Sequence, residues 1–171
     1  MNKLITLLVL LMIVSTAYAH QSSTSFISLQ GNGDKTMAEW KVSISSVLTL
    51  LILDRNNDGN INWLEVKNQS NRFWQLLENN LVISGTNGQC LLSPPVNQSL
   101  AVEKILDKNY LLIQFSVNCT FNSIKNIDYH YFFKIDNDHK AIVSLADQDR
   151  ASVHILSADN NRIQLAASSV N

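Results

Sequence analysis

Alternation of apolar and polar residues along most of this chain is the feature that most restricts its fold. In residues 36–44 every second side chain is apolar, which is the period of a β-strand with one buried face. That face would hold Ala38, Trp40, Val42 and Ile44. A strand is also expected at 26–30, and Gly31-Asn32-Gly33-Asp34 between the two predicts a hairpin turn. The alternation returns after residue 81, including a strand expected over 127–135, and the whole pattern predicts about eight strands.

A different period, close to that of a helix, interrupts the strands between residues 45 and 80. Ser45 and Ser46 are suited to cap a short helix over 47–53, and a longer helix is predicted over 63–81. Its apolar face would hold Trp63, Val66, Phe73, Leu76 and Leu77. The polar stretch 68–71 predicts a bend in that helix. The fold class that follows is α+β, a mostly antiparallel β-sandwich with a helix–loop–helix insert near the N-terminus.

The polar loop between the two predicted helices has the residue order of a calcium-binding loop. It covers the twelve residues 54–65, with side-chain oxygens at its first, third, fifth and twelfth positions. These positions hold Asp54, Asn56, Asp58 and Glu65. Calcium prefers six to eight oxygen ligands, and Glu65 is expected to supply two of them from the following helix. The loop resembles that of the EF-hand superfamily, which predicts one bound Ca²⁺.

The other positions of the loop agree with this interpretation. Gly59, the sixth residue, allows the positive φ that turns the chain round the ion. Asn60, the seventh, is expected to bind through its backbone carbonyl, and Asn62, the ninth, through a water molecule. Ile61 is the apolar residue expected to hold the loop against the protein. With three carboxylates we expect micromolar to millimolar affinity and a mainly structural role for calcium.

The loop has one alternative interpretation, and a second segment of the chain resembles its beginning. Residues 54–65 could be a solvated turn rich in Asn and Asp that holds no metal, although chance does not put the glycine, the isoleucine and the terminal glutamate in register. A second segment, Asp136-Asn137-Asp138-His139, begins like such a loop but has no glycine at its sixth position. We interpret it as a hairpin turn.

The first 19 residues have the pattern of a secretory signal peptide. A basic start precedes the apolar run 4–14, and small residues end at Ala19, where cleavage is expected. The mature chain would then be one exported domain, residues 20–171, with the EF-hand at about 45–80, in the periplasm or secreted. No later stretch of about 20 apolar residues occurs, so we expect no transmembrane anchor after signal removal.

Cys90 and Cys119 are the two cysteines of the chain, and export would place them in an oxidising compartment. A disulfide between them is the expected state. A reactive thiol pair is the alternative, but it lacks the C-x-x-C spacing.

Charge and motifs exclude several classes of function. The formal net charge of −1 argues against nucleic acid as a partner, because duplex binding needs a basic surface. The chain contains no G-x-S-x-G, H-E-x-x-H or P-loop sequence, and we expect no enzymatic activity. A calcium-binding module of the cell envelope is the favoured function, with another envelope protein as a candidate partner.

Three stretches together resemble a bacterial family. They are residues 20–29, 53–65 and 133–145, the last of which contains Asp136, Asp138 and His139. Over most of its mature length the chain is similar to the exported N-terminal domain that precedes the membrane part of some HupE/UreJ-like proteins. The resemblance implies an exported domain with the calcium loop and a two-cysteine β region. Metal transport belongs to the membrane part of that family, and no such part is expected here.

His20 supports an alternative function. After cleavage at Ala19, its amine and imidazole would form a chelate for copper, as in proteins that resemble copper monooxygenases and CopC-like carriers. Such a site needs a further histidine, and no other histidine of the chain has metal-ligand spacing to a second one. A periplasmic copper or nickel carrier that uses His20 is therefore the alternative to the calcium-binding module.

Overall fold

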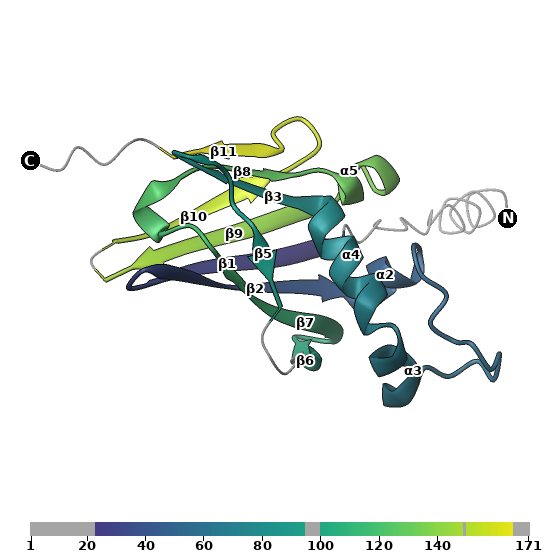
Figure 1. The fold of residues 1–171 in the computed structure, drawn as a ribbon. Helices are drawn as coiled ribbons and strands as arrows, with labels where there is room; N and C mark the ends of the chain where they lie inside the picture. Colours follow the sequence, from purple (N-terminus) through teal and green to yellow (C-terminus); the bar gives the residue numbers. More distant parts are fainter. Residues whose placement is uncertain (1–22, 95–99, 149, 166–171) are drawn as a thin grey trace, which may run out of the picture.

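The computed structural model describes residues 23–94, 100–148 and 150–165, in which two β-sheets are accompanied by short helices (Figure 1). The predicted signal peptide, its cleavage at Ala19 and the terminal His20 lie outside these residues. The elements in chain order are β1 (Thr24–Asn32), β2 (Lys35–Ser43), α2 (Ile44–Leu48), α3 (Trp63–Asn68), α4 (Ser70–Asn80), β3 (Leu81–Gly85), β4 (Gly88–Gln89), β5 (Leu92–Ser93), β6 (Leu100–Ile105), β7 (Lys108–Val117), η1 (Phe121–Ser123), β8 (Ile124–Tyr129), α5 (Tyr131–Ile135), β9 (Lys140–Asp147), β10 (Arg150–Leu156) and β11 (Arg162–Gln164).

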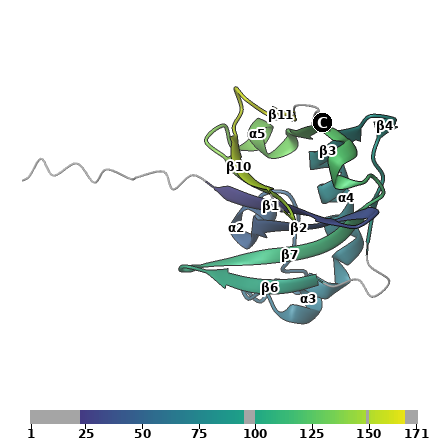
Figure 2. The same cartoon turned by 90° about the vertical axis from the view of Figure 1, so that its left-hand side faces the viewer.

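The larger sheet has the strand order β10-β9-β1-β2-β7-β5, and β6 also pairs with β7 (Figure 2). The smaller sheet has the order β11-β8-β3-β4. Among the described strands, β1 and β9 pair in parallel and the other pairs are antiparallel, so the prediction of mostly antiparallel pairing is confirmed. The eleven strands assigned in the described ranges exceed the predicted number, because two-residue and three-residue strands leave little trace in sequence periodicity.

The predicted first hairpin is confirmed. Asn32 pairs with Lys35 across a two-residue turn, and Gly33 has the positive φ of 59° that such a turn requires. Along β2 the side chains of Ala38, Trp40 and Val42 are buried, as the alternation predicts. The hairpin therefore places one apolar face of β1 and β2 in the core.

Both sheets and α4 contribute to one hydrophobic core. Its largest fully buried side chains include Trp40 from β2, Phe115 from β7, Tyr129 from β8 and Phe73 from α4. Trp74 of α4 packs edge-on against Phe115, with ring centroids 6.3 Å apart. Figure 1 shows α2, α3 and α4 gathered at one end of the sheets, with the loop before α3 extending beyond them.

The helical segment differs from its prediction at both helices. The short helix covers Ile44–Leu48, earlier than the predicted 47–53, and its C-cap residue Thr49 donates its hydroxyl to the carbonyl of Ser46 at 2.6 Å. Ser43 is its N-cap residue, and Ser45 and Ser46 lie inside it. The longer helix is divided at Gln69 into α3 and α4, within the polar stretch where a bend was predicted.

The predicted strand over 127–135 is wrong in its second half, where the chain forms α5. Asn80, fully buried at the end of α4, is the cause. Its side-chain Oδ1 accepts a hydrogen bond from the backbone N–H of Phe132 at 3.0 Å, and its backbone carbonyl accepts one from His130 at 3.2 Å. These bonds end β8 and start a helix, so Phe132 and Phe133 are both buried while Tyr131 is 41% exposed.

The predicted disulfide between Cys90 and Cys119 is present, with the Cα atoms 5.6 Å apart. It ties the segment after β4 to the end of β7. Gly85 lies against it, since a Cβ at this position would approach the Cys119 sulfur and the Ser123 carbonyl oxygen to 3.1 Å. Across the described ranges, no helix has the length and apolar character needed to cross a membrane.

Candidate metal centre

Two buried residues anchor the ends of the predicted calcium loop. Leu53, before the loop, is 1% exposed, and Val66, after it, is 4% exposed. Residues 55–64 between them are exposed to solvent, and Asp54 is partly buried. The loop is therefore a solvent-facing segment whose two ends are fixed in the core.

Asp54, the first residue of the loop, accepts two hydrogen bonds from the backbone further along. Its Oδ2 accepts the N–H of Gly59 at 2.9 Å, and its Oδ1 accepts the N–H of Asp58 at 3.2 Å. A carboxylate that gathers backbone N–H groups in this way curls the chain into a compact turn. The first, fifth and sixth positions are thus held together by the backbone.

The third, fifth and seventh positions repeat the same arrangement. Asn56 Oδ1 accepts the N–H of Asp58 at 3.0 Å, and Asp58 Oδ1 accepts the N–H of Asn60 at 2.8 Å. The Asn56 side-chain amide also donates to Asp58 Oδ2 at 2.9 Å. The structure therefore brings Asn56 and Asp58, two predicted ligands, into direct contact.

Positive φ angles occur at two residues of the loop, Asn57 with 57° and Gly59 with 80°. Asparagine tolerates this left-handed conformation better than most residues with a side chain, and glycine adopts it without cost. The prediction that the sixth residue needs a positive φ is confirmed.

Glu65 closes the loop from the start of α3. Its Oε1 accepts the N–H of Arg55 at 3.1 Å, and its Oε2 accepts the N–H of Asn62 at 3.1 Å. Asn62 Oδ1 in turn accepts the N–H of Glu65 at 3.1 Å, which completes a capping box at the N-terminus of α3. The carboxylate of the twelfth residue therefore reaches back over the loop to its second and ninth residues.

The donor atoms of this loop are of the kind that a calcium ion requires. Carboxylate and amide oxygens are hard ligands, and each hydrogen-bonded carboxylate oxygen keeps a further lone pair. Asn56 presents its amide nitrogen to Asp58, so a cation bound beside Asp58 would require the Asn56 amide to rotate and present its oxygen instead. In the described part of the chain, no three side chains of His, Cys, Asp or Glu form a group that could hold a metal by themselves. Asp54, Asp58 and Glu65, the three carboxylates of the expected ligand set, are therefore not gathered into one cluster, and the structure links them through hydrogen bonds to the loop backbone.

The surroundings of the loop differ from the predictions in two respects. Ile61, expected to hold the loop against the protein, is 36% exposed, and Trp63, predicted on the buried face of the helix, is 48% exposed. Five residues separate the end of α2 from Asp54, so the preceding helix does not run into the loop. Leu53, rather than Ile61, holds the loop to the core.

The segment 136–139, interpreted from sequence as a hairpin turn, lies between α5 and β9. Asp136 accepts the N–H of Asp138 at 3.0 Å, which is a local turn contact. His139, which the sequence placed in this turn, is completely buried. The alternation pattern gave no indication of this burial.

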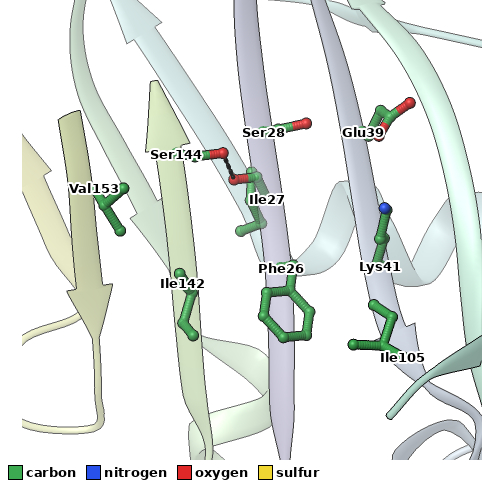
Figure 3. Close-up of a pocket in the computed structure, with 9 residues that line it drawn as sticks. All are labelled: Phe26, Ile27, Ser28, Glu39, Lys41, Ile105, Ile142, Ser144 and Val153. Carbon is green, nitrogen blue, oxygen red and sulfur yellow. Dashed lines mark hydrogen bonds between the residues drawn. The ribbon is translucent and has the colours of Figure 1, made fainter. Parts of the chain in front are cut away.

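A shallow hollow of about 280 Å³ lies on the outer face of the larger sheet (Figure 3). Phe26, Ile142 and Val153 line its apolar part, and Glu39 and Lys41 stand at its other side. Lys41 forms an ion pair with Glu103 at 2.7 Å, and Glu39 accepts a hydrogen bond from Gln114 at 2.8 Å. Both charged groups of the hollow are therefore engaged with neighbours, and we assign no chemistry to it.

Comparison with known protein families and with curated proteins gave no match to this chain. The resemblances to EF-hand proteins and to HupE/UreJ-like proteins stay predictions. The alternative copper or nickel site at His20 also stays a prediction, since His20 lies outside the described residues.

Proposed function

We propose that this protein is an exported calcium-binding protein that holds one Ca²⁺ in the loop 54–65, with Asp54, Asn56, Asp58, Glu65 and the carbonyl of Asn60 as ligands. Asn62 would act through a water molecule. The observation that carries the proposal is the contact between Glu65 and the second and ninth residues of the loop. This contact holds the twelfth-position carboxylate beside the backbone of Arg55, the residue that follows Asp54.

The calcium ion would act mainly as a structural element. Carboxylates at three positions of a compact loop repel one another, and a divalent cation removes that repulsion. Bound calcium would also fix α3 against the buried Leu53, because the ligands come from both ends of the loop. In this proposal the helix–loop–helix segment is an EF-hand unit carried by a sandwich of the two sheets, and the domain serves as a binding module of the cell envelope.

The test is a calorimetric titration of the mature, calcium-depleted protein with CaCl₂, together with thermal melts in chelator and in excess calcium. We expect one saturable site and a higher melting temperature with calcium. At a free concentration 100 times the dissociation constant, the linkage would add about 2.7 kcal/mol to the free energy of unfolding. No heat and no shift of the melting temperature up to millimolar calcium would make the loop a solvated turn.

Glu65→Gln tests the twelfth-position ligand. The variant removes one charge and one of the two carboxylate oxygens, so calcium affinity should fall by about tenfold or more. Its amide nitrogen would also face one of the two backbone N–H groups that Glu65 accepts, so the stability of the calcium-free variant is measured alongside. Glu78→Gln is the matched control, because Glu78 is exposed on α4 and lies outside the loop. If Glu65→Gln bound calcium as the parent does, the proposed ligand set would be wrong.

A further inference from the structure

A continuous chain of polar side chains crosses the core beside β1. The Asp136 carboxylate accepts from Ser23 Oγ at 2.5 Å, and Ser23 Oγ lies 2.6 Å from His139 Nδ1. The other ring nitrogen, His139 Nε2, lies 3.0 Å from Ser25 Oγ, which lies 2.9 Å from the Tyr129 hydroxyl. The chain connects the start of β1 to β8 and to the turn before β9.

The middle of this chain is sealed from solvent. Ser25, Tyr129 and His139 are each 0% exposed. The His139 ring is stacked between aromatic neighbours, with centroid distances of 5.1 Å to Phe132 and 5.9 Å to Tyr129. A charge placed on this ring would have no water to solvate it.

The available donors and acceptors fix the direction of each hydrogen bond between Asp136 and Tyr129. The Asp136 carboxylate can only accept, so Ser23 donates its single hydroxyl hydrogen to it. Ser23 Oγ must therefore accept a hydrogen bond from His139 Nδ1. Nε2 of the neutral ring is then an acceptor and receives a hydrogen bond from the Ser25 hydroxyl. Ser25 Oγ in turn accepts a hydrogen bond from the Tyr129 hydroxyl. Each serine hydroxyl donates once and accepts once, and the ring is neutral with its hydrogen on Nδ1.

Protonation of the ring is incompatible with this arrangement. With hydrogens on both nitrogens, His139 would donate to Ser25 Oγ, and Ser25 would either donate to Tyr129 or accept hydrogen bonds from both neighbours. One hydroxyl hydrogen, that of Tyr129 or that of Ser25, would then lose its acceptor, and Trp40, the other group beside the Tyr129 hydroxyl, offers no acceptor. An indole N–H such as that of Trp40 can only donate. Protonation of His139 would therefore leave one buried hydroxyl donor without an acceptor and add one buried charge.

The charged groups round His139 are few. Burial lowers the pKa of His139 to about 4, with Asp136 opposing this shift and Lys140 adding to it. The hydrogen bond from Ser23 holds the pKa of Asp136 below its ordinary value, so this acceptor stays ionised. Tyr129 on β8 keeps its proton, because burial raises its pKa. From α5 the ring faces the apolar Phe132 and Phe133, and the Lys134 of this helix is exposed.

We propose that this polar chain is an acid-sensitive latch: protonation of His139 uncouples the start of β1 from the turn that precedes β9. β1 lies between β9 and β2 in the larger sheet (Figure 1), and its parallel pairing with β9 begins at Thr24 and Lys140. The backbone N–H of Lys140 donates to the Ser23 carbonyl at 3.0 Å, directly beside the latch. Opening would start at this end, because Ser23 and His139 directly precede Thr24 and Lys140, the first pair of the parallel ladder.

His139→Gln tests the latch, because a glutamine amide offers one donor and one acceptor at a similar separation and does not titrate. The free energy of unfolding of both proteins is measured with denaturant between pH 7 and pH 4 at one fixed calcium concentration. Below pH 6.5 His139 of the parent is protonated in the unfolded state before it is protonated in the folded state, so acid favours unfolding. The unfolding constant of the parent relative to that of His139→Gln should therefore rise by up to about tenfold per pH unit below pH 6.5. His154→Gln, on the outer strand β10, is the matched control and should keep the pH dependence of the parent. Equal pH dependence of the parent and His139→Gln would overturn the proposal.

Hydrogen exchange of the parent gives a second measurement if His139→Gln does not fold. After correction for intrinsic exchange rates, protection of the Lys140 amide should fall between pH 7 and pH 4 before that of the amides in the β2–β7 pair. The latch would be excluded if these amides lost protection together or if none lost it.

Discussion

Backbone conformation makes Gly59 the most sensitive residue of the proposed calcium loop. Its φ is 80°, and a Cβ added there would meet no heavy atom within 4 Å. The constraint on substitution is therefore the left-handed backbone and not a lack of space. Asn57 has a similar φ of 57°, but an asparagine side chain is compatible with it.

Gly59→Val should disrupt the loop. A β-branched residue at this φ is strained by about 1–3 kcal/mol, and relief of the strain would move the carboxylates of Asp54 and Asp58 apart. We expect a large loss of calcium affinity by calorimetry and a lower unfolding free energy. Asn57→Gly is the control and should bind like the parent. Parent-like calcium binding by Gly59→Val would show that the positive φ is not needed.

At the scale of the element, the capping box joins the loop to α3. Asn62 and Glu65 satisfy each other's backbone N–H groups, so the helix begins where the loop ends. The same two residues are expected to hold the cation, Glu65 directly and Asn62 through water. Helix formation and metal binding therefore use the same side chains.

Asn62→Ala should destabilise the protein even without calcium. Loss of an N-cap side chain costs about 1 kcal/mol, because one backbone donor of the first turn loses its partner. The measurement is urea unfolding in the presence of a chelator. Asn68→Ala, at an exposed position in the last turn of α3, should change the free energy of unfolding much less. Equal effects of the two substitutions would argue against the cap.

Asn80 is a second junction between elements, and it ends α4 while it starts α5. Its amide nitrogen donates to the Leu76 carbonyl at 2.7 Å, and its oxygen accepts from Phe132 at 3.0 Å. Asn80→Leu keeps the branched shape of the side chain but leaves the buried Phe132 N–H without a partner, which costs about 1–3 kcal/mol. Urea unfolding measures this loss. The neighbouring Asn79→Leu, at an exposed position, serves as control, and similar stability of the two variants would contradict the role of Asn80.

At the scale of the whole molecule, the disulfide and the parallel β1–β9 pair connect distant parts of the chain. The Cys90–Cys119 bond closes a loop of 29 residues between the segment after β4 and the end of β7. The β1–β9 pair brings the first described strand beside one more than a hundred residues later, with Ser25 opposite Ala141. The disulfide lowers the entropy of the unfolded chain. The β1–β9 pair closes a long loop only when the chain folds, and this closure costs entropy.

Replacement of both cysteines by alanine should lower the free energy of unfolding by about 3–4 kcal/mol, as expected for a loop of this length. Unfolding of the parent with and without reductant measures the same quantity, and reductant should not affect the double variant. The prediction fails if the fully reduced parent is as stable as the oxidised protein.

Much of this fold follows from contacts close in the sequence. The β1–β2 hairpin needs only alternation and a glycine-containing turn, and the break between α3 and α4 follows from polar residues of low helix propensity. The predicted ligand residues of the loop lie within twelve positions, so their hydrogen bonds to one another are local. Short-range physics of this kind can be read from the order of residues alone.

The sequence by itself determined the hairpin, the polar loop with its left-handed glycine and the cysteine pair. Only the tertiary structure decided that Tyr131–Ile135 is a helix, that β1 pairs in parallel with β9 and that His139 is buried. The partners that decide these features are remote: Phe132 is capped by a residue 52 positions away, and His139 is bonded to one 114 positions away. Apolar residues occupy every second position from 127 to 135, with Phe132 the one apolar residue between them, and a turn-forming Asp-Asn-Asp precedes His139, so local pattern favours the wrong answer at both places. Long-range hydrogen bonds overrule it, because a buried polar group without a partner costs more than a local preference is worth.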